Sequence, residues 1–291
     1  MGRLQSSAQS RFDALTSTEW LAAHLEDPLV RILDGSFHVP GSGRDARAEY
    51  RRCHVPSAQF FDIDAIRDES SDLPHMLPSA EVFATKVGAR GIGNEHHVVV
   101  YDAPGSAGAP RVWWTFRVFG HRRVSVLDGG LAKWHAEGRP VTDSAPEVRP
   151  VPYRADDDKR ALVRACADLL ANLTTGREQV VDSRGPGRFS GVEAEPRPAR
   201  KRGHIPGSTN MPFSDFIDHE RSGVWRSADE IRGLFARAGV DLNKPIVSIC
   251  GSGVTACTTA LAAFLLGRDD VAIYDGSWAE WGNRDDTPVE R

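Results

Sequence analysis

Residues 245–266, PIVSICGSGVTACTTALAAFLL, decide the fold of this chain. The apolar run at 245–249 is typical of a buried strand, and the small, apolar run at 260–266 is typical of a buried helix. Between these runs Cys250 opens a glycine-rich loop, CGSGVTA, at 250–256. The pattern therefore predicts a strand, a tight loop and a helix in direct succession.

The predicted loop gives the Cys250 thiol a setting that suits a nucleophile. Backbone N–H groups of a loop at a helix N-terminus, together with the helix dipole, stabilise a thiolate. Cysteines in such settings have pKa values of about 3.5–7.5 instead of about 8.5. The alternative is a buried structural cysteine at a turn. The glycines and the polar Ser252 and Thr255 favour a cradle for an anion, so we expect Cys250 to be reactive.

The second half of the chain repeats the first. Landmarks recur in the same order, 147–150 residues apart: His-apolar-Pro turns at 54–56 and 204–206, apolar runs at 98–102 and 246–250, and Asp-Gly motifs followed by tryptophan at 127–134 and 274–281. This ordered agreement predicts two homologous domains. Asp102 occupies the position of Cys250 in the first copy. The fold therefore does not require a cysteine there, which strengthens the expectation that Cys250 serves chemistry.

Strands alternate with helices in each copy, and the strands are almost continuously apolar. We predict an α/β fold of two tandem domains, each a mostly parallel sheet with helices on both faces. The expected boundaries are a non-catalytic domain at 1–139, a linker at 140–160 and a catalytic domain at 161–291. The linker is rich in proline and contains three consecutive aspartates, a composition typical of extended chain. Ligands of such sheets bind beyond the carboxyl ends of the strands, where the Cys250 loop is expected.

Composition excludes several classes of function. The 291 residues carry a formal net charge of −4 and are 40% hydrophobic, so no general charge attraction to nucleic acid or an anionic membrane is expected. The apolar run 260–266 is far too short for a membrane span, and the first residues have no apolar core, so we expect neither a membrane span there nor a secretory signal. The four cysteines form no disulfide framework and match no zinc spacing. We expect a cytoplasmic protein without a metal, although a short organellar address stays open.

Further motifs match a known family. The tandem repeat with a cysteine only in the second copy resembles the two-domain rhodanese-like sulfurtransferases, and the CGSGVTA loop is most similar to that of the 3-mercaptopyruvate sulfurtransferases. The resemblance covers nearly the whole chain. It is carried by FFDID (60–64), HML (75–77), APRVWWTFRVFGH (109–121), LDGG (127–130), GRF (187–189), EPRP (195–198), GHIPG (203–207) and YDGSWAEWG (274–282).

The resemblance implies a reaction in two steps. The Cys250 thiolate takes the sulfur of 3-mercaptopyruvate, pyruvate leaves, and the enzyme persulfide passes its outer sulfur to a thiol acceptor such as thioredoxin, or to cyanide in an assay. The amides of the loop would stabilise the thiolate and the persulfide. These loop residues are Gly251, Ser252, Gly253, Val254 and Thr255. No metal, nucleotide or organic cofactor is implied.

The resemblance also implies roles for residues outside the loop. Arg188 and Arg197 match the family's substrate-binding arginines, which suit the carboxylate of the donor. A Ser–His–Asp arrangement would fall on Ser252, His75 and Asp64 and would span both predicted domains. Two alternatives remain open: His75 lines the pocket without acid–base work, and Asp62 takes the place of Asp64. Arg184, nearer the strand end, has a weaker claim to a binding role.

Loop composition separates related activities. Thiosulfate-specific members of the family carry basic residues just after the cysteine, where this chain has the neutral Gly251 and Ser252. Rhodanese-like phosphatases use a longer loop of the CxxxxxR type, whereas Ala256 stands six positions after Cys250. The sequence thus favours mercaptopyruvate over thiosulfate and disfavours phosphate. A thiosulfate sulfurtransferase and a non-catalytic persulfide carrier or redox module remain the alternatives.

Several residues recur at the same place in both copies and are therefore expected to belong to the scaffold. They are His54 with His204, and Trp134 with Trp281.

Overall fold

The computed structural model describes residues 14–156 and 162–291. The expectations for the N-terminal dozen residues, for the end of the linker at 157–160 and for the first residue of the catalytic domain lie outside these ranges. Contacts divide the chain into two units, and each is described by itself. Among the described residues, unit 1 comprises 14–66, 78–156 and 218–225; unit 2 comprises 67–77, 162–217 and 226–291.

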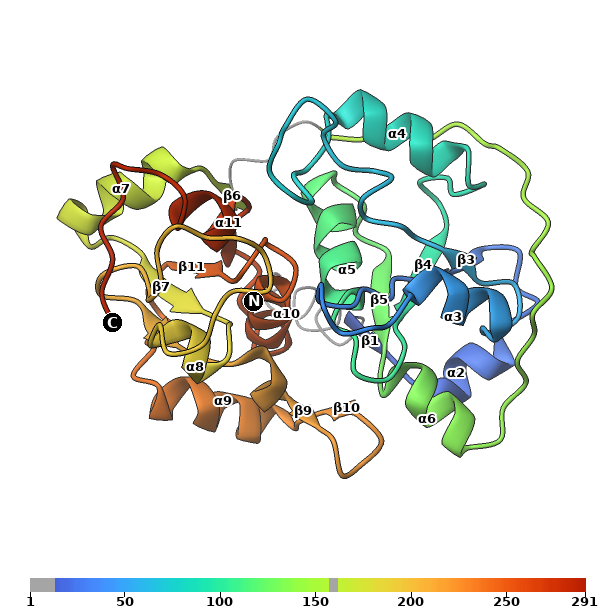
Figure 1. The fold of residues 1–291 in the computed structure, drawn as a ribbon. Coiled ribbons are helices and arrows are strands. Elements are labelled where there is room, and N and C mark those ends of the chain that lie inside the picture. The colour runs from blue at the N-terminus through green and yellow to red at the C-terminus, as the bar shows by residue number, and fades with distance from the viewer. Residues whose placement is uncertain (1–13, 157–161) are drawn as a thin grey trace, which may run out of the picture. The chain divides into compact units, whose positions relative to one another are not determined.

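Unit 1 is built on a five-stranded sheet in the order β1-β5-β4-β2-β3. Figure 1 labels β1, β5, β4 and β3. All its strand pairs are parallel. The strands are β1 (Leu15–Thr16), β2 (Val30–Asp34), β3 (Gln59–Phe60), β4 (His97–Tyr101) and β5 (Val124–Leu127). The helices are α2 (Thr18–Ala23), α3 (Ala46–Arg52), α4 (Ala80–Gly88), α5 (Ala109–Val118) and α6 (Gly130–Ala136).

Unit 2 repeats this plan in the order β6-β12-β11-β7-β8, again with parallel pairs. Its strands are β6 (Val163–Arg164), β7 (Gln179–Asp182), β8 (Thr209–Asn210), β11 (Ile246–Ile249) and β12 (Ala272–Tyr274). Its helices are α7 (Cys166–Thr175), α8 (Pro186–Phe189), the 3₁₀ helix η2 (Phe213–Phe216), α9 (Ala228–Arg237), α10 (Ala256–Leu265) and α11 (Ser277–Trp281). A separate two-stranded sheet pairs β9 (Ile217–Asp218) with β10 (Val224–Trp225), and all of it except Ile217 belongs to unit 1. The predicted α/β fold of two tandem units is confirmed.

The period-2 alternation of the central strand decides which helices cover each face in unit 2. Val247 and Ile249 pack in one core cluster with α7 and α11, which include Leu169, Trp278 and Trp281. Ser248 points to the opposite face. There its hydroxyl and that of Thr259 in α10 both bond to Ser183, at 3.1 and 2.8 Å. Both faces of the sheet are therefore covered, which explains why β11 is buried along its whole length (Figure 1).

The same alternation organises unit 1. Val99 and Tyr101 of β4 pack with α2 and α6 through Leu21 and Trp134. The indole of Trp134 donates to the carbonyl of Pro140 at 2.7 Å, as that of Trp281 in unit 2 donates to the carbonyl of Pro288 at 2.8 Å. Both tryptophans are fully buried. Their predicted place in the scaffold is confirmed.

Two short segments pack in the unit that is formed mainly by the other half of the chain. Residues 67–77 form part of unit 2, and residues 218–225 form part of unit 1. His75 therefore belongs to the same unit as Cys250 although it precedes the linker in the chain. This exchange of segments brings His75 into the unit that contains the predicted site.

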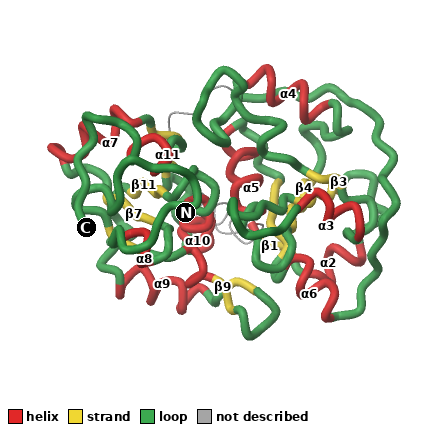
Figure 2. The backbone as a smooth tube through the Cα atoms, viewed as in Figure 1, coloured by secondary structure: helices red, strands yellow, loops and turns green. Residues whose placement is uncertain are grey.

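The proline-rich stretch runs along unit 1 as extended chain. Residues 143–156 contain no helix or strand (Figure 2). Val151 donates its N–H to the carbonyl of Gly88, and Asp156 donates to that of Phe119, each at 3.0 Å. Among the helices in the described ranges, none has the length and apolar character needed to cross a bilayer.

Candidate active site

Cys250 follows β11, a central strand of the unit 2 sheet, and is 2% exposed. The parallel neighbours β7 and β12 end beside it. The thiol therefore lies at the carboxyl edge of the sheet, where the sequence predicted a site. The loop runs to Thr255, and α10 begins at Ala256, so the predicted succession of strand, loop and helix is confirmed.

The first turn of α11 holds the backbone at the cysteine. The N–H of Cys250 donates to the hydroxyl of Ser277 at 3.2 Å, and Trp278 donates its N–H to the carbonyl of Cys250 at 3.0 Å. Ala279 donates in the same way to the carbonyl of Gly251 at 2.8 Å. Further along, Gly253 has φ +75°, a left-handed conformation that favours glycine. These contacts fix the direction in which the loop leaves the strand.

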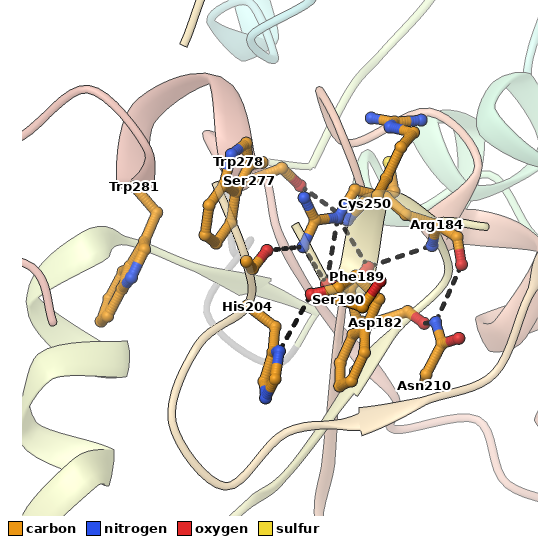
Figure 3. Close-up of polar contacts among 12 residues, drawn as sticks. Asp182, Arg184, Phe189, Ser190, His204, Asn210, Cys250, Ser277, Trp278 and Trp281 are labelled. Atoms are coloured by element: carbon orange, nitrogen blue, oxygen red, sulfur yellow. Dashed lines mark hydrogen bonds and ion pairs between the residues drawn. The ribbon is translucent and has the colours of Figure 1, made fainter. Parts of the chain in front are cut away.

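Arg184 is an internal ion-pair partner and does not reach the surface. Its side chain is fully buried, over the ring of Trp278 at 4.2 Å, and it pairs with Asp182 and Glu195 (Figure 3). Burial by itself lowers the pKa of Arg184, but the two carboxylates outweigh it and raise the pKa above its usual range. Removing one member would leave a buried charge without its partner. This structural role agrees with the expectation that Arg184 is less suited than Arg188 or Arg197 to bind the substrate.

Arg188, in α8, reaches over the start of the loop. Its Nε donates to Glu195 Oε2 at 3.0 Å, and its Nη2 also pairs with that oxygen. A Cβ atom added at Gly251 would lie 2.5 Å from Arg188 Nη2. Glycine at 251 therefore lets this guanidinium approach the loop backbone. Glu195 bridges Arg184 and Arg188 and stands in the same EPRP motif as Arg197, but nothing in the sequence pattern singled it out.

Arg197 lies between two residues of the hypothetical triad. Its Nη1 donates to Ser252 Oγ at 3.5 Å, and its Nη2 is 2.8 Å from Nε2 of His75. A guanidinium has only donors, so Nε2 of His75 is the acceptor in this contact. Both Ser252 and His75 are buried. The structure thus brings Ser252, Arg197 and His75 together beside the Cys250 loop.

Asp64 belongs to unit 1. It lines a cavity of about 510 Å³ there, together with Asp62, Phe60, Arg44 and Arg47. Asp62 accepts the N–H of Asp64 at 3.0 Å and pairs with Arg47 at 2.7 Å. Asp62 therefore has a structural duty in the turn after β3, and the choice between Asp64 and Asp62 stays a prediction.

The comparisons with known proteins agree with this geometry. The family profile for the rhodanese-like domain matches the chain twice, at residues 17–137 and 165–284. The chain belongs to the rhodanese-like family. The human 3-mercaptopyruvate sulfurtransferase is 49% identical over 274 residues, which cover 92% of this chain and 91% of that protein. The thiosulfate sulfurtransferase of Cricetulus griseus is also 49% identical, over 280 residues, or 94% of this chain and 93% of that protein.

A solved structure extends the comparison. That of SseA from Escherichia coli, described with the rhodanese fold and catalytic mechanism of 3-mercaptopyruvate sulfotransferases, has a TM-score of 0.82 and 36% identity. It covers 92% of this chain and 99% of its own. Together these matches make this rhodanese-like protein a sulfurtransferase, as the sequence predicted.

The rhodanese-like repeat also explains the paired histidines. His54 Nδ1 lies 2.8 Å from the carbonyl of Tyr50 and stacks on its ring at 4.2 Å, while His204 makes the matching contacts with Phe189, at 3.0 and 3.8 Å (Figure 3). Each histidine also forms an antiparallel bridge, His54 with Thr142 and His204 with Glu290. Both copies use the histidine to tie a turn to a later segment of the chain. Their predicted place in the scaffold is therefore confirmed.

The degenerate loop of unit 1 offers a carboxylate in place of the thiol. Asp102 Oδ2 accepts the N–H of Ala109 at 3.1 Å, at the start of α5. Burial raises the pKa of Asp102 to about 7, against the lowering effect of these backbone bonds. Within the described residues, no group of three or more His, Cys, Asp or Glu side chains is arranged to hold a metal ion.

Proposed function

We propose that this sulfurtransferase takes the sulfur of 3-mercaptopyruvate onto Cys250 and passes it to a thiol acceptor, such as thioredoxin, with release of pyruvate. The observation that carries the proposal is the set of two guanidinium groups at the Cys250 loop, one above Gly251 and one on Ser252. Arginine binds planar carboxylates with two donors at once, and the donor carries a carboxylate next to a carbonyl.

In the first step the Cys250 thiolate attacks the sulfur of the donor. An S–S bond forms and the C–S bond breaks, and its electron pair leaves on carbon as the enolate of pyruvate. The donor thiol loses a proton and the enolate gains one. The acceptor thiolate then attacks the outer sulfur of the persulfide and restores the Cys250 thiolate. Loop amides from Gly251 to Thr255 stabilise the sulfur anions, since a helix N-terminus follows them.

We assign Arg188 and Arg197 to the carboxylate of the donor, and the buried Ser252 and His75 to proton transfer or to the alignment of Arg197. The direct neighbours of the guanidinium of Arg197 support the second assignment. Asp64 remains our proposed carboxylate partner, with Asp62 as the alternative.

Thiosulfate is the competing donor, because thiosulfate sulfurtransferases are as similar to this chain as the mercaptopyruvate enzymes are. The neutral Gly251 and Ser252 favour a donor of lower charge than a dianion. Steady-state assays that compare pyruvate release from 3-mercaptopyruvate with thiocyanate formation from thiosulfate test this choice. We expect kcat/KM to be higher for 3-mercaptopyruvate; a clear preference for thiosulfate would refute the proposed donor. Turnover well above one per enzyme distinguishes an enzyme from a persulfide carrier.

We further propose a cytoplasmic location and retain 1–139, 140–160 and 161–291 as the boundaries of the repeat along the sequence, with 67–77 and 218–225 as the two segments that pack in the other unit. The cysteines support the location, since Cys53, Cys166, Cys250 and Cys257 are thiols and not disulfides, as a reducing compartment would keep them. The repeat supports the boundaries.

A further inference from the structure

The two exchanged segments end at equivalent positions of the repeat. Residues 67–77 of unit 2 end at Leu77, and residues 218–225 of unit 1 end at Trp225. These end residues are 148 positions apart, the same offset that separates Asp34 at the end of β2 from Asp182 at the end of β7. The exchange is therefore a repeated feature of the fold and not an isolated excursion of the chain.

Each end residue is held by an equivalent aspartate. Leu77 donates its backbone N–H to Asp275 Oδ2 at 2.8 Å, and Trp225 donates its N–H to Asp128 Oδ1, also at 2.8 Å. Asp128 directly follows β5 and Asp275 directly follows β12, each in an Asp-Gly motif. We call each aspartate and the N–H it accepts a clasp. The fold builds the same clasp twice.

Of the two clasps, only the one in unit 2 lies close to the proposed active site. His75 stands two residues before Leu77, is 2% exposed, and has φ +60°, a left-handed conformation that strains a residue with a side chain. Such a backbone persists only where its surroundings hold it. Asp68 donates its N–H to the carbonyl of Met76 at 2.9 Å, so anchored backbone groups follow His75 directly.

His75 in turn holds the guanidinium of Arg197 at 2.8 Å, next to Ser252. We propose that Asp275 is a positioning residue of the donor site: its clasp on Leu77 fixes His75, and His75 fixes Arg197. A carboxylate suits this duty because a charged acceptor makes a stronger hydrogen bond than a neutral one. β12 is the parallel neighbour of β11, so Asp275 and Cys250 lie at the same edge of the sheet. The inference rests on the proposed function through the role of Arg197.

Asp275→Ala tests the clasp, and Asp128→Ala is its matched control because it removes the same contact where no nucleophile lies. With Arg197 released, we expect the KM for 3-mercaptopyruvate to rise about 5- to 50-fold in Asp275→Ala, with a smaller change in kcat. Asp128→Ala should stay within about twofold of wild type in both constants. Asp275→Asn retains an acceptor oxygen but loses the charge, so its KM should lie between those of wild type and Asp275→Ala. It also serves if Asp275→Ala does not fold, because its KM should still exceed that of wild type.

A double variant distinguishes a positioning role of Asp275 from general destabilisation of the fold. If Asp275 acts through His75, the double variant Asp275→Ala/His75→Ala should have the KM of His75→Ala alone. Additive effects would overturn the inference.

A readout independent of turnover is the modification of His75 by diethyl pyrocarbonate, followed by peptide mass spectrometry. Buried His75 should react slowly in wild type and in Asp128→Ala, and at least about 5-fold faster in Asp275→Ala, since loss of one buried hydrogen bond shifts local opening by that order. If wild type fails to use 3-mercaptopyruvate, the proposed function fails, but this rate still decides whether the clasp exists. Equal rates and equal KM values in the two alanine variants would overturn the clasp.

Discussion

Gly251 decides how closely Arg188 approaches the backbone of the Cys250 loop. A side chain at 251 would meet Arg188 Nη2 and displace it, although the backbone could stay where it is. The absence of a side chain, and not only the absence of a charge, therefore shapes the donor site. The sequence shows that the loop is neutral, but it does not show that a side chain at position 251 would collide with Arg188.

Gly251→Arg should reverse the preference between donors. We expect kcat/KM for 3-mercaptopyruvate to fall about 10- to 100-fold, the worth of one charge-assisted hydrogen bond, and activity with thiosulfate to rise. Gly251→Ala is the control, because it displaces Arg188 without adding charge and should lose mercaptopyruvate activity without gaining thiosulfate activity. Unchanged kinetics in both variants would contradict the role given to Arg188.

The buried carboxyl group of Asp102 should make the stability of the folded chain depend on pH. Its pKa rises from 3.8 to about 7 in the folded chain, so the ionised carboxylate is less stable there than in the unfolded chain. Below pH 4 it is protonated in both states and has no effect. Between pH 4 and 7 its ionisation progressively destabilises the fold. The Tm of Asp102→Asn minus that of wild type should therefore increase over this range and level off above pH 7. A difference that is constant with pH would show that the carboxylate is not perturbed.

At the scale of elements, the histidine turns tie α3 and α8 to later segments of the chain. His54 contacts both Tyr50 in α3 and the backbone of Thr142, far along the sequence. This duty needs the ring of a histidine for stacking and its nitrogen for bonding, which explains why both repeats carry the same residue without a catalytic reason.

His54→Ala should lower the free energy of unfolding by about 1–3 kcal/mol through loss of the stack and of a buried hydrogen bond. Donor kinetics of the folded variant should equal those of wild type. Thermal unfolding and steady-state assays at a temperature well below Tm measure both. A loss of activity without a loss of stability would contradict a scaffold role.

At the scale of the whole molecule, the repeat made most of the fold predictable. The apolar runs that became β4 and β11 and the helix α10 follow from local pattern, and the position of Cys250 follows from them. The exchange of residues 67–77 and 218–225 does not, because it depends on contacts between segments far apart in the chain. For the same reason the sequence suggested His75 but could not reveal that Arg197 lies between it and Ser252.

In the proposed reaction Cys250 carries the transferred sulfur. Intact mass spectrometry after brief exposure to 3-mercaptopyruvate, without an acceptor, tests this assignment. We predict a gain of one sulfur atom on wild type, its absence from Cys250→Ser, and its removal by a reduced thiol. No adduct on wild type, or an adduct that persists in Cys250→Ser, would contradict the claim.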